Sequence, residues 1–119
     1  MKAIAKFFVV AILIGSTSAA AFASPIRGRL VDMTRAQARS TVFYNEVFRG
    51  GEVTTISIVG DGDTDLDLYV YDSNGNLIAS GVGLSDRETV SIVPFATGNF
   101  RVEVRNLGNV WNQFTITMR

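Results

Sequence analysis

Apolar and polar residues alternate along several short stretches of the chain. Leu66, Leu68 and Val70 alternate with polar or amphipathic neighbours, and the same period of two recurs in residues 100–105 and 114–118. Side chains of an extended strand point alternately to its two faces, so this period predicts strands with one buried and one solvent-facing side. The pattern predicts about seven or eight short strands. They lie at residues 27–33, 41–48, 52–59, 65–71, 77–80, around 90–92, 100–105 and 114–118.

Turn residues separate these stretches about every ten residues. The strongest turn signal is Asn74-Gly75, a pair that tolerates positive φ at both central positions of a tight hairpin. Residues 34–39 show no clear period, and either a loop or a single helical turn fits them. Short strands with one wet face are typical of antiparallel sheets, and two such sheets stack into a sandwich. The predicted fold class is therefore all-β, an antiparallel β-sandwich, with an open barrel as the alternative.

The first 23 residues follow a different pattern. Lys2 and Lys6 precede an apolar run at residues 7–14, and Ala21-Phe22-Ala23 has the form of a cleavage signal. These are the three parts of a secretory signal peptide, whereas a membrane-spanning helix needs about 20 apolar residues. We therefore expect cleavage after Ala23, or alternatively after Ala20, and a secreted or periplasmic product. The expected organisation is a signal peptide at 1–23, an N-terminal arm or edge strand at 24–39, and a β-sandwich domain at 40–119.

Composition excludes several classes of function. The 119 residues include no His and no Cys, which removes imidazole bases, thiol nucleophiles, thiolate zinc sites and disulfides. Cleavage after Ala23 would also remove Lys2 and Lys6, the only lysines. A mildly acidic product without lysine is a poor match for the phosphate-neutralising surface of a nucleic-acid-binding protein. We therefore expect no nucleic-acid partner, no membrane span and no enzymatic activity.

Alternating aspartates mark the stretch before the strand at 65–71. Carboxylates two residues apart on an extended segment share a face, and calcium takes six to eight hard oxygen ligands. The stretch does not fit an EF-hand, because Leu66 replaces the required Gly and Asp72 the required Glu. Two interpretations stay open: a calcium site of another kind, or aspartates that cap turns and keep a strand edge soluble. The candidate calcium ligands are Asp61, Asp63, Asp65 and Asp67, of which Asp67 is the one expected to be structural.

Three aromatic residues form a candidate ligand-binding face. Tyr69 and Tyr71 share the side of their strand that faces away from Leu68, and Trp111 lies near the start of the last strand. Outward aromatic rings on a sandwich can stack on sugars or anchor a protein partner. The alternative is that they pack on the outer residues of neighbouring strands.

The stretch from Asp65 to Ser80, DLDLYVYDSNGNLIAS, resembles the central motif of the bacterial pre-peptidase C-terminal domain family. The stretch TGNFRVEV at 97–104 is similar to that family's later hairpin, and FTIT at 114–117 fits its last strand. The resemblance implies a jelly-roll-like β-sandwich from a secreted bacterial protein. It also implies a non-catalytic module that usually follows a secreted peptidase; some relatives bind collagen or polysaccharide, and some bind calcium. No peptidase precedes the domain in this sequence.

Three functions then compete. The first is an exported, non-catalytic module that binds an extracellular or envelope protein or polysaccharide, with or without calcium. The second is an accessory partner or inhibitor of a separately encoded secreted peptidase. The third is a small hydrolase that depends on Asp65 or Asp67, which is the weakest because His, Cys and Lys are missing. The sequence does not specify the ligand or the oligomeric state.

Overall fold

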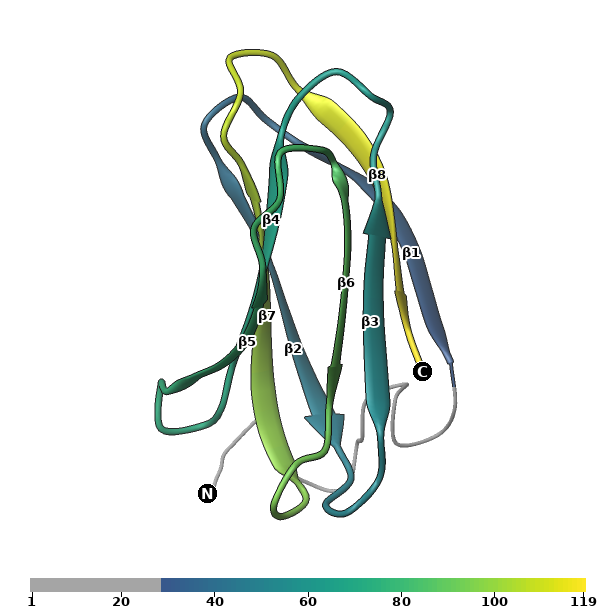
Figure 1. The fold of residues 1–119 in the computed structure, drawn as a ribbon, viewed down its shortest axis with the longest axis vertical. Coiled ribbons are helices and arrows are strands. Elements are labelled where there is room, and N and C mark those ends of the chain that lie inside the picture. Colours follow the sequence, from purple (N-terminus) through teal and green to yellow (C-terminus); the bar gives the residue numbers. More distant parts are fainter. Residues whose placement is uncertain (1–28) are drawn as a thin grey trace.

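The computed structural model describes residues 29–119, which form an all-β sandwich of eight antiparallel strands and contain no helix (Figure 1). The predicted fold class is thereby confirmed. No segment in this part of the chain forms a helix that could cross a membrane. The strands are β1 (Leu30–Ala36), β2 (Thr41–Phe48), β3 (Thr54–Val59), β4 (Leu66–Tyr71), β5 (Leu77–Gly81), β6 (Arg87–Ile92), β7 (Gly98–Asn106) and β8 (Asn112–Met118).

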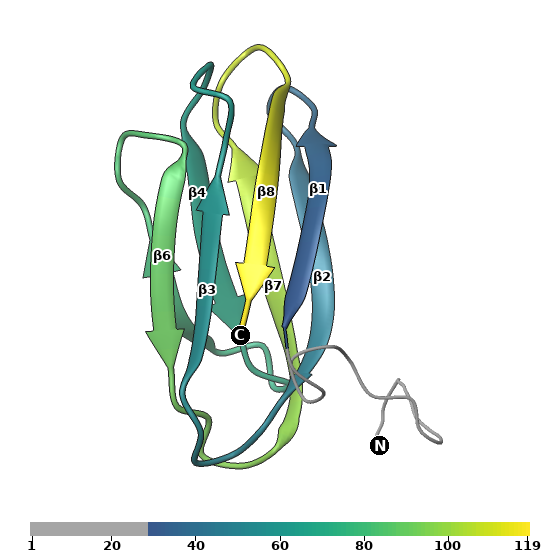
Figure 2. The ribbon, with the colours of Figure 1, turned by 90° about the vertical axis from the view of Figure 1, so that its right-hand side faces the viewer.

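The strand order is that of a jelly roll. One sheet has the order β1-β8-β3-β6 and the other β2-β7-β4-β5 (Figure 2). The first strand pairs with the last, the second with the seventh, the third with the sixth and the fourth with the fifth. The chain therefore resembles one long antiparallel hairpin, with its tip at the β4–β5 turn, rolled until β3 meets β8 and β4 meets β7.

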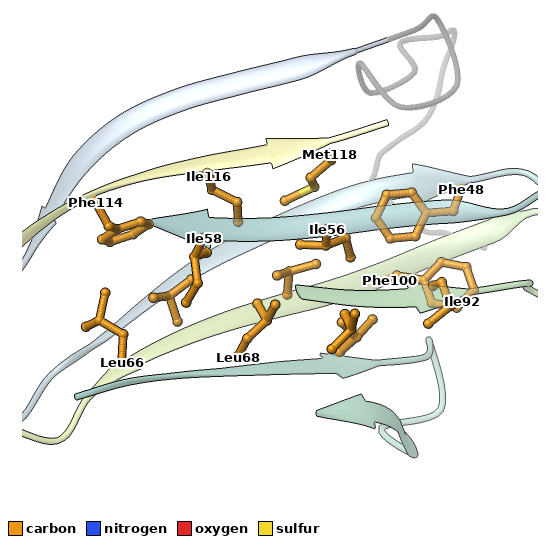
Figure 3. Packing of buried hydrophobic residues seen from close by; sticks show 14 of the residues in the cluster. Phe48, Ile56, Ile58, Leu66, Leu68, Ile92, Phe100, Phe114, Ile116 and Met118 are labelled. Atoms are coloured by element: carbon orange, nitrogen blue, oxygen red, sulfur yellow. The ribbon is translucent and has the colours of Figure 1, made fainter. Parts of the chain in front are cut away.

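Apolar side chains from the inner faces of both sheets fill the core (Figure 3). Leu66, Leu68 and Val70 of β4 are fully buried, as their alternation predicts. Burial of this apolar surface is the main force that holds the two sheets together, since the chain contains no disulfide. Further inward residues include Ile56, Ile58, Phe100, Val102, Val104, Phe114, Ile116 and Met118.

Two local expectations differ from the structure. The stretch expected to be a loop or a helical turn at 34–39 continues β1 as far as Ala36, which is fully buried. The sequence shows no period there because β1 is an edge strand with mostly exposed residues. In the β4–β5 turn only Gly75 has a positive φ, of 82°, and not Asn74. Asp72 instead caps this turn by accepting hydrogen bonds from the backbone N–H groups of Asn74 and Asn76.

The expected signal peptide lies outside the described residues, as does its cleavage site at Ala23. The segment expected to be an N-terminal arm or edge strand is described from Arg29 onward. Its strand, β1, pairs along its whole length with β8. This strand is therefore joined by backbone hydrogen bonds to the domain that was expected to begin at residue 40.

Candidate functional site

A network of charged and aromatic side chains covers the outer face of the β2-β7-β4-β5 sheet. The pairing of β7 with its two neighbouring strands brings these side chains together. Phe43 of β2 and Tyr69 of β4 both lie opposite Glu103 of β7, while Tyr71 lies opposite Arg101. We call this surface the aromatic–arginine face. It consists of Phe43, Asp67, Tyr69, Tyr71, Arg101, Glu103 and Arg105.

Glu103 is the centre of this face. Its side chain is only 7% exposed, accepts hydrogen bonds from Arg105 and forms an ion pair with Arg101. Arg101 Nε lies 2.9 Å from Glu103 Oε2, while Arg105 donates from Nε and Nη2 to Glu103 Oε1 at 3.1 and 2.9 Å. The hydrogen bond to Glu103 raises the pKa of Arg105. Hydrogen bonds to a charged and nearly buried carboxylate are stronger than neutral ones, so Glu103 fixes the guanidinium group of Arg105 and attracts that of Arg101 through the ion pair.

The aromatic rings of the face contact the guanidinium groups of the same two arginines. The Arg105 guanidinium carbon lies 4.0 Å from the Tyr69 ring centroid, and its Nη2 donates to the Tyr71 hydroxyl at 2.8 Å. The Arg101 guanidinium lies 5.0 Å from the Tyr71 centroid and 5.9 Å from that of Phe43. These are cation–π distances. The two tyrosine rings also stack on one another at 6.5 Å, so both predicted tyrosines belong to one ordered array.

Asp67 lies at the margin of this face and is almost entirely buried. The Tyr69 hydroxyl donates to its Oδ2 at 3.3 Å, while Oδ1 is buried with no hydrogen-bond partner. Burial raises the pKa of the Asp67 carboxyl, and the negative charges of Asp65 and Glu88 raise it further. Oδ1 of Asp65 is also buried without a partner. Both oxygens are buried hydrogen-bond acceptors that receive no donor from residues 29–119.

The four predicted calcium ligands do not converge. Asp61 Oδ2 accepts the backbone N–H of Gln113 and Oδ1 accepts that of Asp63, so Asp61 acts as a turn cap. Asp63 is exposed. Asp65 lies directly before β4, and Asp67 is its second residue. Across residues 29–119, no group of three or more acidic side chains is arranged to hold a metal ion. Of the four, only Asp65 and Asp67 have a buried carboxylate oxygen without a hydrogen-bond partner.

Asp86 and Asn112, which the sequence analysis did not single out, organise the loops at this end of the sandwich. Asn112 is fully buried, and its Nδ2 donates to Asp86 Oδ2 and to Thr64 Oγ1, both at 3.0 Å. The backbone N–H of Gly62 also donates to Asp86 Oδ2. A side chain at Gly60 would collide with the Asp86 carboxylate. These bonds join loops 60–65 and 82–86 to the start of β8 in one structural unit.

Trp111 is separate from the tyrosines. It lies in the loop before β8, and Arg35 of β1 sits over its ring at 4.2 Å. Both strands belong to the β1-β8-β3-β6 sheet, whereas the tyrosines lie on the other one. The structure thus brings Tyr69 and Tyr71 together and places Trp111 elsewhere.

The opposite outer face, on the β1-β8-β3-β6 sheet, has a different chemistry. Hydroxyl groups pair across its strands, with Thr55 Oγ1 3.0 Å from Ser91 Oγ and Ser57 Oγ 3.0 Å from Thr89 Oγ1. Neutral side chains therefore satisfy one another there. We call this surface the hydroxyl face, defined by Thr55, Ser57, Thr89, Ser91, Thr115 and Thr117.

Comparisons with known proteins agree with the fold. No protein-family model matches the chain, and no curated protein matches it in sequence. Its structure is similar to the pre-peptidase C-terminal domain of collagenase from Bacillus anthracis, with a TM-score of 0.62, 12% identity, and coverage of 76% of this chain and 90% of that one. It is also similar to Aeromonas hydrophila PliG, a periplasmic inhibitor of g-type lysozyme, with a TM-score of 0.58, 13% identity, and coverage of 76% and 83%. At these identities the likeness shows a shared fold: the chain has the sandwich architecture of a pre-peptidase C-terminal domain.

Proposed function

We propose that this protein is an exported, non-catalytic β-sandwich module that binds a protein or polysaccharide of the cell envelope or the extracellular space. The binding surface is the aromatic–arginine face. One observation carries the proposal: two arginines and three aromatic rings are held in fixed positions on a surface that the core does not require. Arginine and aromatic residues are the types enriched at binding hot spots.

The chemistry of the chain supports binding rather than catalysis. The sequence lacks His and Cys, and the described residues include no Lys. The most perturbed carboxyl group, Asp67, is nearly buried, so it is poorly placed to meet a substrate. The similar structures support the same proposal, because one is a domain of a collagenase and the other an inhibitor that acts on a lysozyme.

The test measures binding to the candidate ligands with and without the face. The exported protein is screened against a glycan array and against purified envelope and secretome fractions. We expect Tyr69→Ala/Tyr71→Ala to abolish the interactions found. Since Tyr71 also bonds Arg105, the milder Phe43→Ser change, at a ring that is 55% exposed, serves as a second variant. Thr115→Ala/Thr117→Ala on the hydroxyl face is the matched control. If folded variants of the aromatic–arginine face keep every interaction, that face is not the binding surface.

A separately encoded secreted hydrolase is the second candidate partner, and an inhibitor or accessory role is the corresponding function. The resemblance to a collagenase domain and to a lysozyme inhibitor favours it. Assays of secreted peptidases and of lysozymes, with the exported protein added, separate this candidate from the first. A fall in hydrolysis that Phe43→Ser relieves would support an inhibitor. If no hydrolase responds and none is cross-linked in the native secretome, the candidate fails.

Calcium is proposed as an assistant to this function, with Asp65 and Asp67 as its carboxylate ligands. The two buried oxygens without hydrogen-bond partners fit a hard cation, which prefers carboxylate oxygens as ligands. Calcium at this position would neutralise the repulsion between the two carboxylates and fix the start of β4. The proposed ligand set leaves Asp61 out, because both of its oxygens already accept backbone hydrogen bonds.

A further inference from the structure

We propose that the aromatic–arginine face receives a carboxylate group of a protein partner, and that Arg101 is the residue that binds it. The carboxylate is an acidic side chain or a C-terminus, and it is presented among apolar groups. The inference rests on the proposed function, because it names the ligand chemistry of the same face.

The two arginines of the face differ in how many donors they have left. Arg105 uses Nε and Nη2 in bonds to Glu103 and Tyr71. Arg101 forms an ion pair with Glu103 through Nε, and no hydrogen bond among residues 29–119 involves its terminal amino groups. Its side chain is also the more exposed of the two, 47% against 37%. Arg101 therefore presents a free pair of terminal amino groups to solvent.

The position of this group is fixed before any ligand arrives. The Arg101 guanidinium is held by Glu103 at Nε and has the ring of Tyr71 on one side and that of Phe43 near the other. An arginine fixed in this way loses little conformational entropy when it binds. Its planar terminal amino groups match the two oxygens of a carboxylate, which can accept two parallel hydrogen bonds.

Arg101 has fewer carboxylates near it than Arg105. Glu103 is shared by both guanidinium groups. The other carboxyl of the face, Asp67, lies opposite Arg105 in the register and on the far side of Glu103 from Arg101. Arg105 therefore has two carboxylates close by and Arg101 has one. A carboxylate from a partner is attracted more strongly to Arg101 than to Arg105 for this reason.

The surroundings of Arg101 favour a protein over a hydrophilic sugar acid. Phe43, on the neighbouring strand, is 55% exposed. Leu77, which lies opposite Tyr71 on the other side, is 51% exposed. Apolar side chains around a charged pair exclude water from it when a partner covers them, and this arrangement is typical of protein–protein hot spots. A sugar ring can stack on Phe43, but a sugar acid offers no apolar side chain to Leu77.

The experiment titrates the exported protein with three probes and follows the arginine Nε–Hε signals by ¹⁵N NMR. The probes are 3-phenylpropionate, which carries a carboxylate on an apolar body, its neutral amide, and trigalacturonate. We expect 3-phenylpropionate to shift the Arg101 signal in a saturable way and the amide to have no effect. Arg101→Lys keeps the charge and loses the planar donor pair, so we expect binding at least tenfold weaker. Arg87→Gln, an exposed arginine on β6 of the other sheet, is the matched control.

Three results would overturn the inference. The amide could bind as well as the carboxylate, or Arg101→Lys could bind 3-phenylpropionate as tightly as the unchanged protein. Trigalacturonate could bind at Arg101 more tightly than 3-phenylpropionate, which would assign the face to acidic polysaccharides. Each of these leaves the proposed function intact, because that function fails only if variants of the face keep all binding to envelope and extracellular ligands. Backbone amide signals of β7 show that each variant is folded.

Discussion

The two outer faces of the sandwich are built from the same kind of strand and yet satisfy their side chains differently. On the hydroxyl face, short neutral groups pair with the strand next to them, as Ser57 does with Thr89. On the aromatic–arginine face, Glu103 binds arginines at positions 101 and 105 of its own strand, and these reach rings on the strands at either side.

The difference indicates which face is the better candidate for recognising a partner. A hydroxyl pair can be replaced at little cost, because water satisfies an exposed hydroxyl almost as well. The ion pairs of Glu103 are different, because its carboxylate is nearly excluded from water and depends on its two arginines. A surface that keeps a buried charge in a fixed array is a better candidate for recognition than a surface of interchangeable hydroxyls. Substitutions on the two faces should therefore change the stability of the protein by different amounts.

The largest effect is expected for Glu103→Gln. Both arginines would lose their counter-charge and Arg105 its charged hydrogen-bond acceptor. We expect the free energy of unfolding to fall by about 3 kcal/mol, since one hydrogen bond to a charged group is worth about 1.5–3 kcal/mol and the ion pair with Arg101 is lost as well. Urea unfolding of the two proteins measures the change. A loss below about 0.5 kcal/mol, the range of ordinary surface substitutions, would show that the array does not stabilise the face.

Calcium gives the next largest effect. If Asp65 and Asp67 bind it, a concentration near 100 times the dissociation constant adds about 2.7 kcal/mol, which corresponds to a rise in melting temperature of about 10–20 °C. Thermal melts in EDTA and in millimolar calcium measure this shift, with Asp65→Asn/Asp67→Asn as the variant that should lose it. Asp61→Asn/Asp63→Asn is the matched control and should keep it. Equal melting temperatures with and without calcium would show that Asp65 and Asp67 do not bind calcium.

A smaller effect is expected from the pH dependence of stability in EDTA. Burial raises the pKa of Asp67 in the folded state above its ordinary value near 4. Between these two pKa values the folded protein binds more protons than the unfolded chain, so the contribution of Asp67 to stability falls as pH rises. Asp67→Asn should therefore be more stable than the unchanged protein at pH 7 and should lose this part of the pH dependence. Urea midpoints from pH 3 to pH 8 provide the measurement, and an unchanged slope in the variant would contradict the assignment.

The smallest effect is expected on the hydroxyl face. Ser57→Ala removes one partner of an exposed hydroxyl pair, and Thr89 can turn to water instead. We expect the free energy of unfolding to change by less than about 0.5 kcal/mol. The same urea protocol as for Glu103→Gln gives a direct comparison. A loss as large as that of Glu103→Gln would mean that the two faces do not differ in the way described.

The strands and their inward residues could be predicted from the sequence because burial leaves a local signal. Leu66, Leu68 and Val70 alternate with the residues that face outward, and each is fully buried. The end of β1 could not be predicted, because an edge strand with mostly exposed residues has no such alternation.

The tyrosines of the candidate site could also be predicted, since they share a face with Asp67. Their partners could not, because the pairing of Tyr71 with Arg101 depends on the register between strands that lie thirty residues apart. The sequence shows that the charged residues Arg101, Glu103 and Arg105 alternate along one strand. Only the strand register shows that aromatic rings lie on the strands at both sides of them. Trp111 was grouped with the tyrosines for the same reason: local patterns do not show which sheet a loop residue lies beside, and Trp111 lies in the loop before β8, next to the other sheet.

Site-specific photo-cross-linking can show whether a partner binds the aromatic–arginine face or the hydroxyl face. A p-benzoylphenylalanine is placed at Phe43 on the aromatic–arginine face in one variant and at Thr89, an exposed position of the hydroxyl face, in another. Both exported proteins are irradiated in the native envelope and secretome. We predict that the variant labelled at Phe43 forms a discrete adduct with a partner and that the variant labelled at Thr89 forms none. An adduct from Thr89 alone, or equal adducts from both positions, would contradict the assignment of binding to the aromatic–arginine face.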